Sequence, residues 1–447
     1  MPAATVATWV IEQEARALLT RLERVKPFAL HETMVPAAAL APSAQSAIER
    51  FLLGGRAALN QRVRAFLRWL DGPGGDAPAA EQQRRFTIIR LQFNDALSQF
   101  DLFTEVITQR SEHETGVWLS GLDLLAQDAL ALPGGFFEPP PLVCYLARGP
   151  GAAIRRARTR LPGGAQNPVA IIRVPRERMV GHGIASSLIH EVGHQGAALL
   201  ELVESLRPTL QQHQQRVREA ERAPWGSWER WISEIVADLW SVAKLGIGST
   251  LGLLGVVSLP RWFVFRPSGA DPHPIPWIRV LLSCAMGEAM YPHPQWRTLA
   301  DVWRSLYPVD AVTDEHRRTL AGLEATMPEF VALLVGHRPA VLRGRSLGEV
   351  LPLAGRRPER LLARYATWLR GPAAMANAPP SLVFAVLGQA RAAGQLSPQR
   401  ESRVLGNLLT HWALRSTLDI SAICADQSRA LAHPPSVLTN RAGGAQP

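Results

Sequence analysis

Apolar residues recur three and four positions apart along most of the chain, the spacing that places them on one face of an α-helix. The pattern predicts helices over these ranges: 5–24, 44–71, 82–131, 279–290, 314–335, 357–370, 379–393 and 397–415. Two short runs bounded by Pro or Gly, 142–146 and 169–174, are rich in apolar and β-branched residues and predict strands. We therefore expect a mainly helical protein with a small β-sheet, in the α+β class.

Clusters of Pro and Gly divide this pattern into three parts. Residues 1–132 are expected to form an N-terminal helical bundle, because a turn cluster begins at Pro133. Residues 133–310 contain both predicted strands and the motifs described next. Residues 311–447 are expected to form a C-terminal helical region that ends in a disordered tail.

The sequence His190-Glu191-Val192-Gly193-His194 carries the most specific chemical signal. Small and apolar residues on both sides predict a buried helix, on which the two histidines lie on one face and can bind one zinc ion. Glu191 then lies beside the metal, where it can take a proton from a zinc-bound water. Two core histidines bonded to the backbone are the alternative interpretation.

An acidic pair, Glu234 and Asp238, begins forty residues after His194 on a stretch that also predicts a buried helix. A working zinc site commonly has three protein ligands and one open position, so Glu234 is the expected third ligand. Asp238 can accept the remaining N–H of a ligand histidine and fix its tautomer. The alternative, a solvated acidic pair, is disfavoured because acids on so apolar a stretch need a partner.

These motifs resemble those of a known family. His-Glu-x-x-His followed by Glu-x-x-x-Asp is the gluzincin arrangement, and Ser233-Glu234-x-x-Ala237-Asp238 is most similar to the Ste-type prenyl-protein and heat-shock metallopeptidases. That group also has a downstream His-Pro followed by Arg, which residues 271–279 match. The resemblance covers roughly residues 165–295.

The resemblance implies a zincin-like metallopeptidase core flanked by helical bundles, with Zn²⁺ bound by His190, His194 and Glu234. Zincin-like folds commonly place an antiparallel edge strand just before the metal helix, and the run 169–174 fits that position. The other implied roles are Glu191 as general base, Asp238 as the acid that orients a ligand, His273 as the oxyanion stabiliser and Arg279 as the organiser of the site.

One departure from the Ste-type group concerns membranes, since its membrane members have several spanning helices that this pattern does not show. The 16 uncharged residues from Leu245 to Pro260 are fewer than the ~20 needed to span a bilayer and include four glycines. They also continue the helix predicted around Glu234. A buried or interfacial segment is therefore favoured over a spanning one.

Charge and cysteine content narrow the functional classes further. The formal charge is +10, but all basic residues except Lys26 and Lys244 are arginine, a bias typical of GC-rich bacterial genomes. We therefore expect no nucleic-acid partner. The densest arginine cluster, within 155–160, is expected to be a solvated loop, with an anion site as the alternative. Cysteines that are far apart and the lack of a signal-peptide pattern favour a cytoplasmic location, with non-classical export left open.

The leading hypothesis is a soluble zinc metallopeptidase that hydrolyses a peptide or protein substrate. One alternative is a non-catalytic, zinc-stabilised scaffold or secretion-apparatus component. Another is a membrane-associated peptidase anchored by residues 245–260. The large helical flanks suggest a restricted substrate or a specific protein partner.

Overall fold

The computed structural model describes residues 3–148, 152–161, 165–175, 182–267, 269 and 271–432. Within these residues the chain is mainly helical and contains one small three-stranded sheet, as the apolar pattern predicts. The predicted tail at 442–447 lies outside the described residues.

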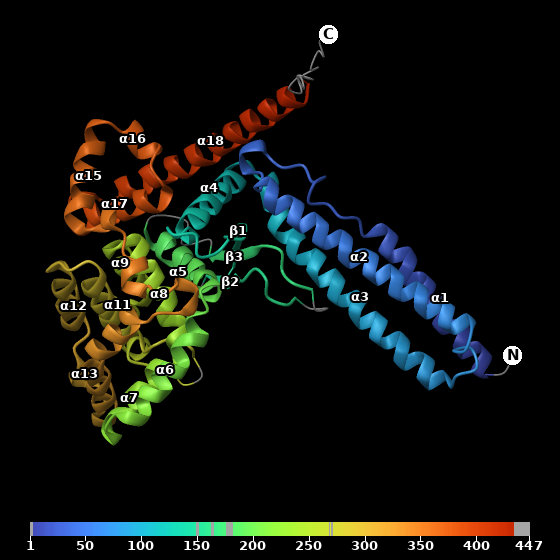
Figure 1. Ribbon diagram of the computed structural model, residues 1–447, viewed down its shortest axis with the longest axis horizontal. Helices are drawn as coiled ribbons and strands as arrows, with labels where there is room; N and C mark the ends of the chain where they lie inside the picture. Colours follow the sequence, from blue (N-terminus) through green and yellow to red (C-terminus); the bar gives the residue numbers. More distant parts are fainter. Residues whose placement is uncertain are drawn as a thin grey trace, which may run out of the picture.

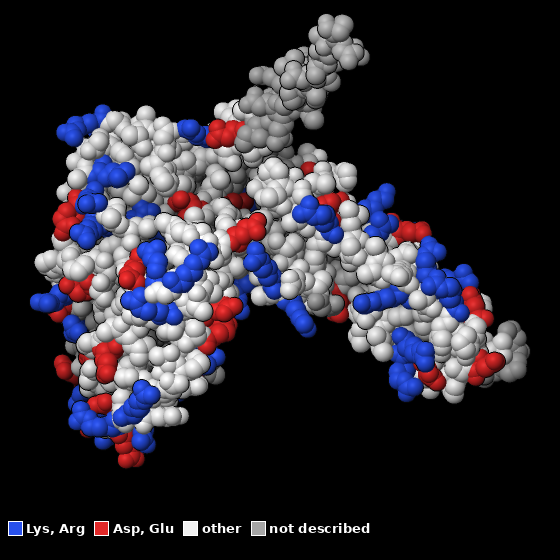
Figure 2. Space-filling model, viewed as in Figure 1, with Lys and Arg blue, Asp and Glu red and all other residues white. Residues whose placement is uncertain are grey.

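Three long helices form an arm that projects from the rest of the molecule (Figure 1). They are α1 (Ala3–Arg24), α2 (Pro42–Asp71) and α3 (Ala79–Thr108). Their apolar faces bury a small core of their own, which includes Leu18, Val63, Phe66, Phe86 and Phe93. On the face seen in Figure 2, basic and acidic residues are interspersed over the arm and the body.

The helix predicted over 82–131 is in fact two helices, α3 and α4 (His113–Leu130). The fully buried Arg110 lies at the break between them. Its guanidinium pairs with Asp123 at 3.0 Å and donates to the Cys144 carbonyl at 2.6 Å. This long-range anchor, which the helical spacing does not show, holds the base of the arm against the sheet.

The sheet has the strand order β1-β3-β2, formed by β1 (Leu142–Ala147), β2 (Ala153–Arg155) and β3 (Ala170–Pro175). β1 pairs with β3 in parallel and β2 pairs with β3 in antiparallel orientation. The expectation that 169–174 is the edge strand is wrong, because β3 has a partner on each side. The edge strands are β1 and β2, and β2 is a three-residue strand that ends at Arg155, where the expected loop begins.

Two crossing helices form the centre of the body, α5 (His182–Leu199) and α8 (Ile232–Leu245). Their neighbours are α6 (Leu202–Arg216), α7 (Glu219–Arg230), α9 (Ile247–Val257) and α11 (Pro276–Met290). The helix around Glu234 does not continue through 245–260, because Gly246 adopts a φ of 57° and separates α8 from α9. α9 then packs between α5 and α17 (Pro380–Ala392).

The remaining helices cover this centre, and the last of them, α18 (Pro398–Ala432), packs along α4 (Figure 1). They are α10 (Arg261–Val264), α12 (Gln295–Leu306), α13 (Asp314–Gly336), α14 (Leu347–Val350), α15 (Pro358–Arg370), α16 (Ala373–Ala376) and α18 (Pro398–Ala432). Single 3-10 turns lie at Pro36–Ala38, Gln109–Ser111, Val309–Ala311, Ala340–Leu342 and Ala354–Arg356.

One described helix, α13, is long and apolar enough to cross a bilayer when judged by length and composition alone. The core helix of a soluble protein meets the same two criteria, and α13 contributes Leu320, Leu323, Phe330 and Leu334 to the buried core. α9 is apolar but shorter.

Candidate metal centre

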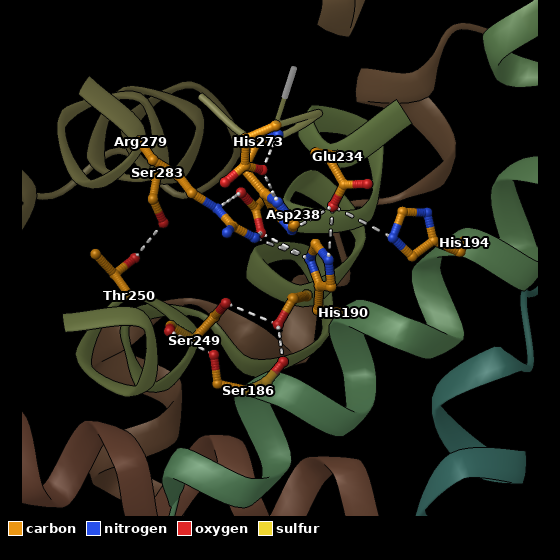
Figure 3. A network of polar contacts seen from close by, with 12 residues as sticks. Ser186, His190, His194, Glu234, Asp238, Ser249, Thr250, His273, Arg279 and Ser283 are labelled. Carbon is orange, nitrogen blue, oxygen red and sulfur yellow. Dashed lines mark hydrogen bonds and ion pairs between the residues drawn. The ribbon is translucent and has the colours of Figure 1, made fainter. Parts of the chain in front are cut away.

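The close crossing of α5 and α8 builds the site. α5 presents His190 and His194 from successive turns, and α8 presents Glu234 opposite them (Figure 3). Gly193 lies at the crossing, where a Cβ atom would be only 2.8 Å from the Cα and the carbonyl oxygen of Ala237. Glycine at this position therefore lets the two helices approach closely enough for the Glu234 carboxylate to reach both imidazoles.

The geometry of His190, His194 and Glu234 fits a metal ion. Their ligand atoms all lie within 4.8 Å of one another. Glu234 Oε2 is 3.2 Å from His190 Nε2 and 3.5 Å from His194 Nε2. A tetrahedral zinc ion with bonds of 2.0–2.2 Å holds its donor atoms roughly 3.3–3.6 Å apart. Two imidazoles and a carboxylate are also a common zinc donor set.

Asp238 and Arg279 support the ligands from behind. His190 Nδ1 donates to Asp238 Oδ1 at 2.8 Å. The Arg279 guanidinium donates to both Asp238 oxygens, at 2.7 and 2.8 Å. Burial alone would raise the pKa of Asp238, but Arg279 and His190 outweigh it and hold that pKa well below its usual range. Asp238 therefore keeps its charge, holds the Nδ1 proton of His190 and leaves Nε2 facing Glu234 and His194.

The same contacts set the pKa values of His190 and Glu234. Burial lowers the pKa of His190, but attraction by Asp238 and hydrogen bonds to Asp238 and Glu234 raise it to about 9. Burial raises the pKa of Glu234, whereas its contacts with His190, His194 and His273 lower it far below the usual range. Glu234 is thus an anion at neutral pH, as a carboxylate ligand must be.

His273 joins the site from the segment before α11. Its Nε2 lies 3.1 Å from Glu234 Oε2, and its Nδ1 lies 2.7 Å from Asp271 Oδ1. Burial lowers the pKa of His273, but Glu234 and Asp271 more than compensate and raise it. Arg266 pairs with Asp271 at 2.6 Å and so fixes the acid behind the ring. With a side chain 40% exposed, His273 is the most accessible of the site histidines.

A cleft of about 340 Å³ runs over the site. Ala153 and Ile154 of the edge strand β2 line one wall, and the floor carries Glu191 and the three candidate ligands. The Glu191 residue is 8% exposed. The structure thus brings all the residues singled out from the sequence, 190, 191, 194, 234, 238, 273 and 279, to one place.

Three contributors were not expected from the sequence. Gly193 lies inside the His-Glu-x-x-His motif, but only its close approach to Ala237 on α8 shows why glycine is needed there. Gln195, 1% exposed, accepts the backbone N–H of Ala157 at 2.8 Å and so ties the end of β2 to the metal helix. The arginines within 155–160 are exposed, but Arg155 ends β2 and Arg156 lines the cleft.

No protein-family model, curated protein or solved structure matches the chain. The resemblance to gluzincins therefore rests on the motifs alone. What the chain shows is a His190, His194 and Glu234 group, on two crossing buried helices, that could hold a metal ion.

Proposed function

We propose that the chain is a zinc-dependent metallopeptidase that hydrolyses peptide bonds in the cleft between β2 and α5. The observation that carries the proposal is the convergence of three zinc-type donors within 4.8 Å beside Glu191, on the floor of a cleft bordered by an edge strand.

Zinc supplies Lewis acidity, which polarises the scissile carbonyl and makes a water molecule acidic enough to deprotonate near neutral pH. His190, His194 and Glu234 would hold the ion. The hydrogen bond from His190 Nδ1 to Asp238 fixes the tautomer that offers Nε2 as the ligand atom. The low pKa of Glu234 keeps it ready to bind as a carboxylate.

Glu191 would act as the general base and then as the general acid. It follows His190 on the metal helix and lines the cleft without belonging to the ligand group. Its carboxylate would take the proton of the attacking water and pass it to the leaving amine. His273, whose pKa is raised, would stabilise negative charge that develops on the carbonyl oxygen.

The edge strand β2 gives the substrate a direction. One side of β2 pairs with β3, and its residues Ala153 and Ile154 line the cleft. A peptide in extended conformation can add to such an edge through main-chain hydrogen bonds. Gln195 fixes the distance between this edge and the metal helix, because its side chain accepts the Ala157 N–H. A substrate strand would therefore lie across the ligands with its carbonyl groups near Glu191.

Metal analysis beside a peptide-cleavage assay tests the proposal. Zinc-loaded wild type should bind one equivalent of zinc and cleave members of a broad peptide library. Glu191→Gln should bind the same zinc and melt at nearly the same temperature, yet lose about 10²–10⁴-fold in rate, the usual cost of a missing general base. His273→Ala should lower kcat by about 10²–10³-fold with little effect on zinc.

Two results would count against this mechanism. If wild type binds zinc but cleaves nothing across the library, the zinc serves a structural role and the scaffold hypothesis replaces the enzyme. If Glu191→Gln cleaves as fast as wild type, Glu191 is not the base.

A further inference from the structure

A second hollow, of about 180 Å³, opens behind the candidate metal centre. Ala152, His190, Glu191 and His273 line both this hollow and the main cleft, so the two spaces meet at the ligands. The rest of its wall comes from α5, α8, α9 and α11. We call it the serine pocket and define it by Ser186, Ser187, Ser249, Leu253, Val256 and Ser283.

We propose that the serine pocket receives the side chain on one flank of the scissile bond and restricts that residue to compact, uncharged types. The inference rests on the proposed peptidase function and names the substrate class. A peptide whose carbonyl lies at the ligands has its neighbouring side chains within reach of both hollows. Because Glu191 and His273 line both the pocket and the main cleft, a residue next to the reacting bond has its side chain within reach of the pocket.

The hydroxyls of the pocket are already engaged with one another (Figure 3). Ser186 Oγ donates to the Ser249 carbonyl at 2.9 Å, and Ser249 Oγ donates to Ser241 Oγ at 2.8 Å. Ser283 and Thr250 share a hydrogen bond of 2.8 Å. A charged side chain entering the pocket would lose its water while these groups keep their present partners, which is unfavourable.

The two ions at the edge of the pocket offer no counter-charge either. Arg279 and Asp238 form a bidentate pair at 2.7 and 2.8 Å, and Asp238 also accepts from His190. Breaking this pair to bind an acidic or basic substrate residue would leave a buried charge uncompensated. The pocket therefore favours neutral side chains.

Volume sets the upper size limit. An apolar cavity of about 150 Å³ holds one benzene molecule. The 180 Å³ serine pocket can thus take a branched aliphatic chain or a single ring, but not an indole. Its apolar surface comes from Leu253 and Val256 on α9. Burying one more methylene there is worth about 10-fold or more in selectivity.

Two half-buried valines provide a matched pair of variants. Val256 lines the serine pocket, whereas Val203 on α6 lines the main cleft and not the pocket. The probes are amino-acid hydroxamates, which bind through the metal and differ only in their side chains. Their affinities for zinc-loaded protein are measured by calorimetry, and the same variants are profiled for cleavage of a peptide library.

For wild type we expect hydroxamate affinity to rise about 10-fold or more from glycine to valine or leucine and to fall for tryptophan, aspartate and lysine. Val256→Phe fills the pocket and should move the optimum to glycine or alanine. Val256→Ala enlarges it and should admit tryptophan, which keeps the test decisive if the phenylalanine variant does not fold. Val203→Phe and Val203→Ala change the main cleft and should shift the affinities of all members of the series together, without changing their order.

The outcomes separate the two claims. The pocket proposal is overturned if the hydroxamate affinities do not differ between side chains in wild type, or if Val256 and Val203 variants change their order equally. In either case, observed peptide cleavage would still support the proposed peptidase function. A series that follows Val256 while no peptide is cleaved supports the pocket and overturns the peptidase. Failure of the protein to bind zinc overturns both.

Discussion

Replacing Gly193 with alanine should weaken zinc binding while leaving the protein folded. The new Cβ would lie 2.8 Å from Ala237 backbone atoms, and relief to an ordinary contact of 3.4 Å requires α5 and α8 to separate by about 0.6 Å. Metal–ligand distances tolerate only about ±0.2 Å. The change would therefore pull Glu234 out of reach of at least one imidazole.

The stability cost should be modest, because alanine gains about 1 kcal/mol of helix propensity over glycine while overpacking costs about 1–3 kcal/mol. The net loss is then at most about 2 kcal/mol. Zinc affinity should fall about 10–100-fold, as when groups that orient metal ligands are changed.

A chelator-competition titration measures zinc affinity, and denaturant unfolding measures stability in the same preparation. Gly255→Ala is the matched control, since Gly255 is an α9 residue whose added Cβ would have no neighbour within 4 Å. The control should bind zinc as wild type does. A folded Gly193→Ala protein with wild-type zinc affinity would refute the close-crossing argument.

Three further changes test other parts of the account. Asp238→Asn removes the charge that holds the His190 Nδ1 proton, so zinc affinity should fall roughly 10–100-fold in the same titration; unchanged affinity would remove Asp238 from the site. Gln195→Leu removes the acceptor of the Ala157 N–H, so hydrogen exchange at Ala157 should accelerate and KM for peptides should rise more than kcat falls; unchanged exchange would show that the tether is not needed. Burial lowers the pKa of Lys244 to about 8, so the folded state binds fewer protons than the unfolded state between pH 8 and about 10.4. Unfolding free energy of wild type should therefore rise by about 3 kcal/mol across that window relative to Lys244→Met, and parallel pH profiles of the two proteins would contradict the buried charge.

Sequence patterns predicted the parts of the molecule that local spacing encodes. The helical positions of His190, His194 and Glu234 follow from apolar neighbours and from the four-residue interval, and the structure brings these side chains together. The long amphipathic helices and both strands over 142–146 and 169–174 follow from the same kind of signal.

Features that depend on distant partners were not encoded locally. A three-residue strand such as β2 has no period of its own, so its place at the sheet edge came only from pairing with β3. The break between α3 and α4 depends on the contacts of Arg110 with Asp123 and Cys144. The break between α8 and α9 depends on the positive φ of Gly246, which lies within an apolar run. The helix α12 was missed for a different reason, because its residues do show helical spacing but were not included among the predicted helices.

X-ray absorption at the zinc edge of the zinc-loaded wild-type chain tests the central claim most directly. The account predicts one zinc ion per chain with nitrogen and oxygen ligands only, at about 2.0–2.2 Å, and an imidazole scattering signature from two histidines. The described thiols, Cys144 and Cys284, are buried and take no part in the site. A sulfur ligand at about 2.3 Å, or a spectrum without imidazole, would contradict the assignment of His190, His194 and Glu234 as the metal ligands.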